Sequence, residues 1–172
     1  MKELLAYHIK YSTQHYLDKL EHKDFSMLLN IQRVSSASVQ VGEETISSIG
    51  LGLLVLVCAM PGDTDETCER VAEKVAKIRL FNDNFGKMNR SLIDVNGSIL
   101  IVSQFTLAAN TKSGNRPDFN KAMCPEGAKK IFDELVQKIK RKNIKIQTGV
   151  FGCHMKLKVV NDGPVTIPME FQ

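Results

Sequence analysis

The chain has 172 residues, 43% of them apolar and 24% charged, which fits one globular domain with a core of ordinary size. No run approaches the roughly 18 apolar residues of a membrane-spanning helix, so the sequence predicts no membrane segment. The formal net charge of +4 permits a nucleic-acid partner but does not require one.

Four cysteines are spread along the chain and form no Cys-x-x-Cys unit. A chain of this length does not need disulfides, so we interpret them as buried thiols of a reducing compartment, which favours a cytoplasmic location. Metal ligands usually come in closely spaced pairs, and the sequence therefore predicts no metal site. No cofactor motif is present, and none is expected.

The first 26 residues differ from the rest, because they hold all three tyrosines, three of the four histidines and equal numbers of acidic and basic side chains. They resemble neither a secretory signal nor a transit peptide. We therefore divide the chain into an extension, residues 1–26, and a domain, residues 27–172. The extension is interpreted as a loosely ordered leader or the product of an upstream start codon. His8, His15 and His22 recur every seven residues, so a metal-binding or partner-binding helix face is an alternative.

The domain opens with strand patterns. Alternating apolar residues predict strands around Leu29–Ile31, Val39–Val41 and Thr45–Ile49. The continuous apolar run Leu53–Val57 predicts a strand that is covered on both faces.

A helix is predicted after Pro61-Gly62-Asp63, because apolar residues follow at helical spacing from Cys68 to Ile78. Asp63 is the expected cap, with Glu66 three residues on, and the helix is expected to end near Phe81.

Further along, Asn96-Gly97 predicts a hairpin between the strands Ile93–Val95 and Ser98–Val102. A second helix is expected from Pro125, since proline suits a first helical turn. Its last turn carries Lys138, Lys140, Arg141 and Lys142. These cations either complement the helix dipole in solvent or contact phosphates.

Two more strands are expected after this helix, the second with Phe151 and Met155 at apolar parity, and the chain is expected to close with a short strand from Val165 to Phe171. Many strands and only two helices, without regular alternation, predict an α+β class: a β-rich domain with two main helices.

Two segments break this patterning. The polar cluster Ser103-Gln104-Phe105-Thr106-Leu107 directly follows a buried strand, where functional groups are common, although its side chains could merely satisfy backbone groups. The segment Asn161–Thr166 contains Asn-Asp-Gly-Pro, which is typical of a turn. The peptide bond before Pro164 can be either cis or trans, because proline tolerates both. Conventional catalytic motifs are absent. A Ser103 or Thr106 nucleophile served by His154, the only histidine of the domain, is an alternative.

Together these two segments resemble the signature motifs of the D-aminoacyl-tRNA deacylase family, whose members are also known as D-tyrosyl-tRNA deacylases. The two motifs of that family are Ser-Gln-Phe-Thr-Leu and a later Asn-x-Gly-Pro-Val-Thr. Both are intact in this chain. Further stretches that resemble the family are Ile31-Gln32-Arg33-Val34, Gly86-Lys87-Met88-Asn89, Arg116-Pro117-Asp118-Phe119 and Gln147-Thr148-Gly149. The resemblance spans residues 27–172 and leaves out the extension.

The resemblance implies a barrel-like subunit in a homodimer with active sites at the interface. It implies an enzyme that hydrolyses the ester of D-aminoacyl-tRNA at the tRNA 3′ end, as chiral proofreading in translation. Glycine has no side chain, so glycyl-tRNA, including glycine mischarged on tRNA-Ala, is an expected secondary substrate. A nucleic-acid-binding protein on the same scaffold without deacylase activity is the alternative, and a small-molecule esterase that uses Thr106 is a third hypothesis.

The family pattern also implies roles for single residues. Ser103, Gln104, Phe105 and Thr106 would form the catalytic floor, with the chemical role of Thr106 left open. A cis Gly163-Pro164 would enter the partner's site and reject L-amino acids through its carbonyls, and Arg33 is expected to hold those carbonyls. Phe151 and Met155 would bind the terminal adenosine, unless they are ordinary core residues.

Overall fold

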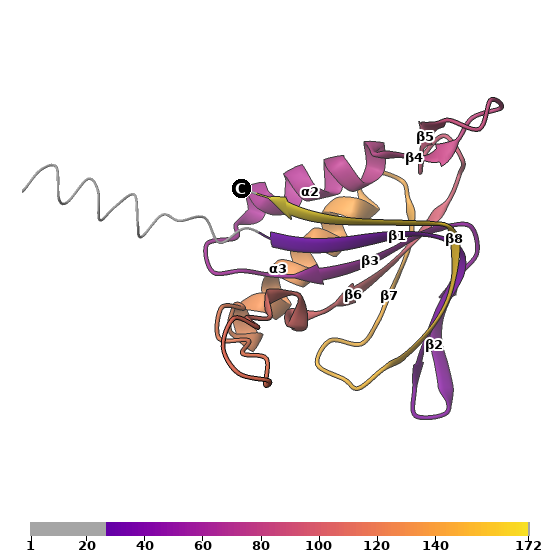
Figure 1. The fold of residues 1–172 in the computed structure, drawn as a ribbon. Coiled ribbons are helices and arrows are strands. Elements are labelled where there is room, and N and C mark those ends of the chain that lie inside the picture. Colours follow the sequence, from indigo (N-terminus) through magenta and orange to yellow (C-terminus); the bar gives the residue numbers. More distant parts are fainter. Residues whose placement is uncertain (1–26, 172) are drawn as a thin grey trace, which may run out of the picture.

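A computed structural model describes residues 27–171, which form a strongly curved sheet covered on one face by two helices (Figure 1). This architecture confirms the predicted β-rich, barrel-like α+β class. The proposed division of the chain at residue 27 and the spacing of His8, His15 and His22 concern residues 1–26. These residues lie outside the described part of the chain, so both interpretations stay predictions.

The longest inner strand is β1, Met27–Val41, which pairs antiparallel with three others. Its second half pairs with β2, Glu44–Ile49, and its first half with β3, Gly52–Cys58. Along its other edge it pairs with β8, Lys156–Phe171. The sequence predicted separate strands at 29–31 and 39–41, but the polar residues between them are accommodated without a break, because β1 stays paired throughout.

The other half of the sheet is parallel. Strand β6, Ser98–Ser103, runs parallel to β3, and β7, Lys145–Thr148, runs parallel to β6. The predicted hairpin at Asn96-Gly97 is therefore wrong. Asn96 does adopt a positive φ of 48°, but the turn leads into a strand that pairs with β3 and not with residues 93–95.

Helix α2, Asp65–Lys77, begins at Thr64, whose side chain exchanges hydrogen bonds with Thr67 as a capping box. The prediction that Asp63 is the cap is wrong, because its carboxylate accepts the N–H groups of Met27 and Met60 instead. That carboxylate ties the start of β1 to the end of β3, a contact between distant segments that local patterning does not reveal.

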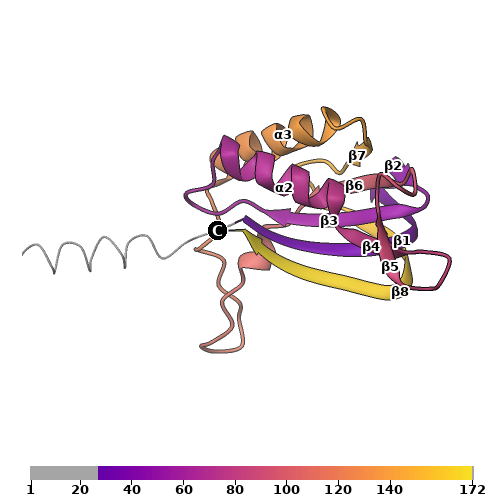
Figure 2. The same ribbon diagram turned by 90° about the horizontal axis from the view of Figure 1, so that it is seen from above.

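Beyond α2 the chain forms strand β4, Arg79–Asn82, and returns as β5, Met88–Ser91. The helix therefore ends at Lys77 and not near Phe81. The second helix, α3, covers Pro125–Lys140 with proline in its first turn, as predicted. Figure 2 shows α2 and α3 side by side on one face of the sheet. No helix within residues 27–171 is long and apolar enough to cross a membrane.

Strand β3 separates two apolar layers, as its continuous apolar run predicts. Leu53 and Val55 pack toward the helices, where Val71 of α2 and Leu135 of α3 belong to the same buried cluster. Leu54 faces the inner side of the curved sheet and belongs to a second cluster, which contains Val34, Val39, Leu100 and Val102.

The basic end of α3 lies against acidic residues of α2. Lys138 bonds to Asp65 at 3.0 Å, and Lys142 bonds to Glu69 and Glu73 at 2.8 Å each. Hydrogen bonds from Lys142 and Lys77 lower the pKa of Glu73 to about 2. Two of the four cations considered for phosphate contact are thus already paired within the chain.

The close approach of β3 and β6 gives a stability prediction. A Cβ added to Gly52 would overlap the Ser98 carbonyl and lie 2.9 Å from the Ser98 nitrogen, whereas one added to Gly50 would meet nothing within 4 Å. We expect Gly52→Ala to lower the free energy of unfolding by about 1–3 kcal/mol through overpacking. Gly50→Ala is the matched control. Equal denaturation midpoints for the two variants would contradict the close approach.

Candidate functional site

A pocket of about 680 Å³ opens where β3 and β6 end, a size that suits a drug-sized ligand. The first wall, which we call the floor, is the chain from Val102 to Phe105, and a second wall comes from residues 119–125 with the first turn of α3. Residues 151–157, which lead into β8, form the third. The two parallel strands place their carboxyl ends together, so the segments that follow them meet at one edge of the sheet.

The floor of the pocket is built from the predicted polar cluster. Ser103 ends β6 opposite Val57, and the Gln104 N–H donates to the Val57 carbonyl at 2.7 Å. The chain then turns into a 3-10 helix, η1, Phe105–Ala108. Ser103, Gln104 and Phe105 line the pocket, but Thr106 does not. The Thr106 hydroxyl accepts a short hydrogen bond from the Gln104 side-chain amide.

Two main-chain donors are available at this turn. Within residues 27–171, the N–H groups of Phe105 and Thr106 have no acceptor, whereas the next one, Leu107 N–H, bonds to the Gln104 carbonyl. This is the usual state of the first N–H groups of a helix, which have no partner within the helix. Unpaired donors beside a pocket can bind an oxygen that becomes negatively charged during a reaction.

Phe151 and Met155 lie on the third wall, and both of their predicted roles are compatible with the structure. They line the pocket, yet Phe151 also packs against Phe132, with ring centroids 6.0 Å apart. The Met155 sulfur accepts the Val150 N–H at 3.3 Å. The strand that was expected to include these residues begins only at Lys156, because a turn precedes it.

The second wall contains residues that patterning missed. Phe119 lines the pocket and meets the Phe105 ring edge-on, with centroids 5.3 Å apart. Met123 and Cys124 follow it, and Cys124 precedes the first turn of α3. The only signal for Phe119 in the sequence was the family-like Arg-Pro-Asp-Phe stretch, since its loop has no periodicity.

Bases and nucleophiles are scarce in this site. No carboxylate of residues 27–171 lines the pocket, and its one imidazole, His154, makes no hydrogen bond there to Ser103 or Thr106. Burial raises the pKa of the Cys58 thiol to about 11, which keeps it neutral near pH 7. Because an amide is no base in either orientation, Gln104 cannot activate the Thr106 hydroxyl. These observations disfavour a side-chain nucleophile.

The second predicted segment forms a bulged corner of β8. Asn161 pairs with Val34 and Thr166 with Gln32, so four residues, 162–165, stand opposite Arg33 alone. We call this segment, Asp162–Val165, the Gly-Pro corner. The peptide bond between Gly163 and Pro164 is cis, as the resemblance implied, and both residues are exposed.

Arg33 holds this corner from beneath. Its buried guanidinium donates from Nε to the Asp162 carbonyl at 3.1 Å and from Nη1 to the Leu80 carbonyl at 2.6 Å. Its Nε also lies 3.2 Å from the Asp162 carboxylate. The expected bonds to the Gly163 and Pro164 carbonyls are not among those formed within residues 27–171. Arg33 instead fixes the residue that precedes them.

The Gly-Pro corner lies away from the pocket of its own chain. Its partner Arg33 is in register with Leu53, whereas Ser103 is in register with Val57, four residues further along β3. Three strand spacings separate β8 from β6, so the offsets are about 14 Å across the sheet and about 13 Å along it. Gly163 and Pro164 accordingly do not line the pocket.

The cysteines provide a chemical check of this pocket. All four thiols are free, but the prediction that all are buried is wrong, since Cys124 and Cys153 are exposed at the pocket. Burial raises the pKa values of both Cys58 and Cys68 to about 11.

We expect a maleimide at pH 7 to modify Cys124 and Cys153 in the folded protein, and the other two only after unfolding. Rapid modification of Cys58, read by mass spectrometry, would contradict this pocket geometry.

Comparison with known proteins adds independent observations. Residues 30–170 match the family model described as D-Tyr-tRNA(Tyr) deacylase. Proteins named D-aminoacyl-tRNA deacylase from Paracoccus denitrificans (strain Pd 1222) and Xanthomonas oryzae pv. oryzae (strain MAFF 311018) are 50% and 52% identical. Each alignment covers 81% of this chain, and 94% and 97% of the relatives.

Two solved structures have the same fold. One, described as c-Myc DNA Unwinding Element Binding Protein, has a TM-score of 0.79 and 40% identity, and covers 84% of this chain and 99% of its own. The other, described as a probable eukaryotic D-amino acid tRNA deacylase, has a TM-score of 0.77 over 86% of this chain and 100% of its own. At 14% identity the second likeness concerns the fold alone.

Proposed function

The chain belongs to the D-Tyr-tRNA(Tyr) deacylase family, and we propose that it hydrolyses the ester of D-aminoacyl-tRNA to free tRNA and a D-amino acid. The observation that carries this function is the family match over residues 30–170. The match includes the residues that the structure gathers at the pocket floor and at the Gly-Pro corner. The protein is accordingly a hydrolase of translation quality control, and we place it in the cytoplasm, where charged tRNAs are used.

In this proposal the pocket receives the 3′ end of the charged tRNA. The terminal adenosine lies against Phe151 and Met155, whose apolar surfaces suit the face of a base. The aminoacyl ester then reaches the floor at Ser103, Gln104 and Phe105. A volume of about 680 Å³ is sufficient for a nucleoside with an attached amino acid.

Hydrolysis proceeds by attack of water on the ester carbon, with the carbonyl oxygen becoming an oxyanion. The unpaired N–H groups of Phe105 and Thr106 stabilise that oxyanion, an effect worth about 10²–10³ in rate for each donor. The carbon–oxygen bond to the ribose then breaks, and the ribose oxygen takes up a proton. The neighbouring 2′-hydroxyl assists the water, which fits a pocket without a carboxylate in the part of the chain that the structure describes.

Selection between D- and L-amino acids is assigned to main-chain atoms of a second copy. We propose a homodimer in which Gly163 and Pro164 of one protomer enter the pocket of its partner. Their carbonyl oxygens occupy the space that an L side chain needs, whereas a D side chain points elsewhere. Such a device reads only the Cα, so it ignores side-chain identity. It also admits glycine, which makes glycyl-tRNA a secondary substrate.

Four observations support a contribution in trans. The Gly-Pro corner is exposed, it is fixed by buried Arg33, and it lies far from the pocket of its own chain. Apolar side chains are also exposed near both elements, with Val160 beside the corner at 57% and Phe105 at the pocket at 56%. Such surfaces are typical of residues that a second protein covers.

The function is tested with two substrates that differ only in handedness. We expect the purified protein to release the amino acid from D-tyrosyl-tRNA at least about a hundredfold faster than from L-tyrosyl-tRNA, a difference of about 2.7 kcal/mol in transition-state binding. Equal hydrolysis of both substrates, or of neither, would refute the function.

The role of the corner gives a sharper prediction. Gly163 has a φ of +123°, and an added Cβ would lie 3.0 Å from Arg33 Nη2 and 3.1 Å from the Val165 nitrogen. Gly163→Ala must therefore displace the corner, and we expect a tenfold to roughly hundredfold fall in kcat/KM for the D-substrate with a smaller D/L ratio.

The matched control is Gly42→Ala, because Gly42 also has a positive φ of +61° but its Cβ would meet nothing within 4 Å. Wild-type discrimination in Gly163→Ala would show that the corner does not select handedness.

A second candidate is a nucleic-acid-binding protein on this scaffold, which the 40% identity to the c-Myc DNA Unwinding Element Binding Protein favours. This function predicts salt-sensitive binding of DNA or RNA that is unchanged in Gly163→Ala, with no ester cleavage. Cleavage that depends on Gly163 supports the deacylase instead.

A further inference from the structure

One loop beside the pocket carries cations without acidic partners. Between η1 and α3, residues 110–123 include three basic side chains, and all of them are exposed: Lys112, Arg116 and Lys121. None of them forms an ion pair within residues 27–171. The one acidic residue of the loop, Asp118, accepts the Asn120 N–H at 3.1 Å. We call residues 110–123 the basic loop.

The basic loop is anchored to the pocket at its base. Asn110 and Asp118 exchange two main-chain hydrogen bonds, at 2.7 and 3.0 Å, which close the loop into a narrow turn. Phe119 then meets Phe105 on the pocket floor, and Met123 N–H bonds to the Ala59 carbonyl at 3.0 Å. The position of the loop relative to the pocket is therefore fixed from both ends.

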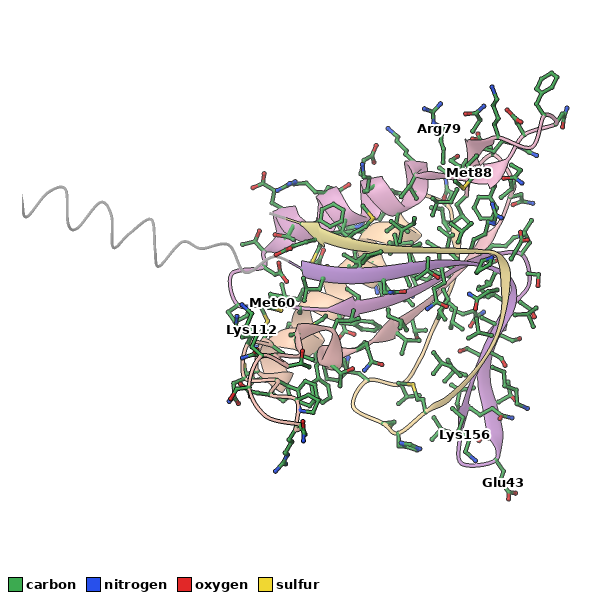
Figure 3. All side chains as sticks on the ribbon, viewed as in Figure 1. Glu43, Met60, Arg79, Met88, Lys112 and Lys156 are labelled. Carbon is green, nitrogen blue, oxygen red and sulfur yellow. The ribbon has the colours of Figure 1, made fainter. Side chains whose placement is uncertain are left out.

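The remainder of the basic loop projects outward. Figure 2 shows the segment between η1 and α3 extending from the sheet on the side opposite α2 and α3. In Figure 3, Lys112 lies at the same end of the molecule as Met60, and Arg79 lies at the far end. Lys121 sits between Asn120 and Ala122, which both line the pocket. Lys121 therefore lies at the edge of the pocket, and Lys112 and Arg116 lie further out on the projecting part of the loop.

We infer that the basic loop binds the phosphates of the single-stranded 3′ end of tRNA, directly upstream of the nucleotide held in the pocket. This inference rests on the proposed function. When the terminal nucleoside occupies the pocket, the preceding phosphates must leave through its entrance. Three cations stand there against one carboxylate, that of Asp118, which forms an ion pair with none of them within residues 27–171, and they form the electrostatic surface that a nucleic-acid backbone requires.

The basic end of α3, which the sequence suggested for this contact, is less suitable. Lys138 is only 11% exposed and pairs with Asp65, and Lys142 pairs with two glutamates of α2. A phosphate bound by Lys138 or Lys142 would first have to break those ion pairs, which leaves Lys140 and Arg141 as the unpaired cations at this end within residues 27–171. The basic loop involves no such exchange.

The test compares a full substrate with a truncated one. In the triple variant Lys112→Ala, Arg116→Ala, Lys121→Ala, we expect KM for D-tyrosyl-tRNA to rise at least about tenfold. The slope of log KM against log salt should fall by about 2, since each lost phosphate contact on a single strand contributes about 0.7. Cleavage of 3′-D-tyrosyl-adenosine, which lacks those phosphates, should stay within about twofold of wild type.

Two control variants separate charge from loop structure. The triple variant Arg70→Ala, Lys74→Ala, Arg79→Ala removes three exposed cations of α2 and β4 and should leave KM for D-tyrosyl-tRNA unchanged. The triple variant Lys112→Arg, Arg116→Lys, Lys121→Arg keeps the charges and should retain the wild-type salt slope.

The result that overturns the inference is an unchanged KM and salt slope in the alanine variant, or an equal loss on both substrates, which would mean that the loop only shapes the pocket. Failure of the proposed function is distinguishable, because the wild-type protein would then cleave neither substrate.

Discussion

The contact of the Arg33 guanidinium with the Asp162 carbonyl is the interaction on which the functional surface depends. It joins β1 to the bulged part of β8, and a second bond to the Leu80 carbonyl ties both to the segment that follows α2. A buried guanidinium needs such acceptors, since an unpaired buried charge would be strongly destabilising. The Gly-Pro corner is therefore held in one place although four residues stand opposite one.

The chemistry of the pocket follows from the side chains that its lining lacks. It is built on the ends of parallel strands, it is lined by sulfur and aromatic side chains, and within residues 27–171 no carboxylate faces it. Such a site has little side-chain chemistry of its own, so we assign the reaction to main-chain donors and to the substrate's hydroxyl. The proposed selection by main-chain carbonyls follows the same principle, because neither proposed step depends on which amino acid is attached.

The sequence predicted the features that depend on neighbouring residues. The periodicity of apolar residues predicted α2 and α3, and Pro125 predicted the start of α3. The continuous apolar run of β3 predicted a strand that is covered on both faces. Features set by distant segments were missed. Asp63 was expected to cap a helix that follows it, but its partner Met27 lies 36 residues away. Likewise, composition singled out Ser103–Thr106, whereas the wall that faces them, from Phe119 to Cys124, comes from a loop without a pattern.

The most direct measurement is the activity of a purified heterodimer with one defective element in each chain. One chain carries Gly163→Ala; the other carries Phe105→Pro, which removes a pocket N–H at a first-turn position where proline fits. If the corner acts in trans, one of the two sites is complete, and we predict about half of wild-type D-tyrosyl-tRNA hydrolysis with normal discrimination. Activity no higher than the mean of the two defective homodimers would contradict a corner that enters the partner's pocket.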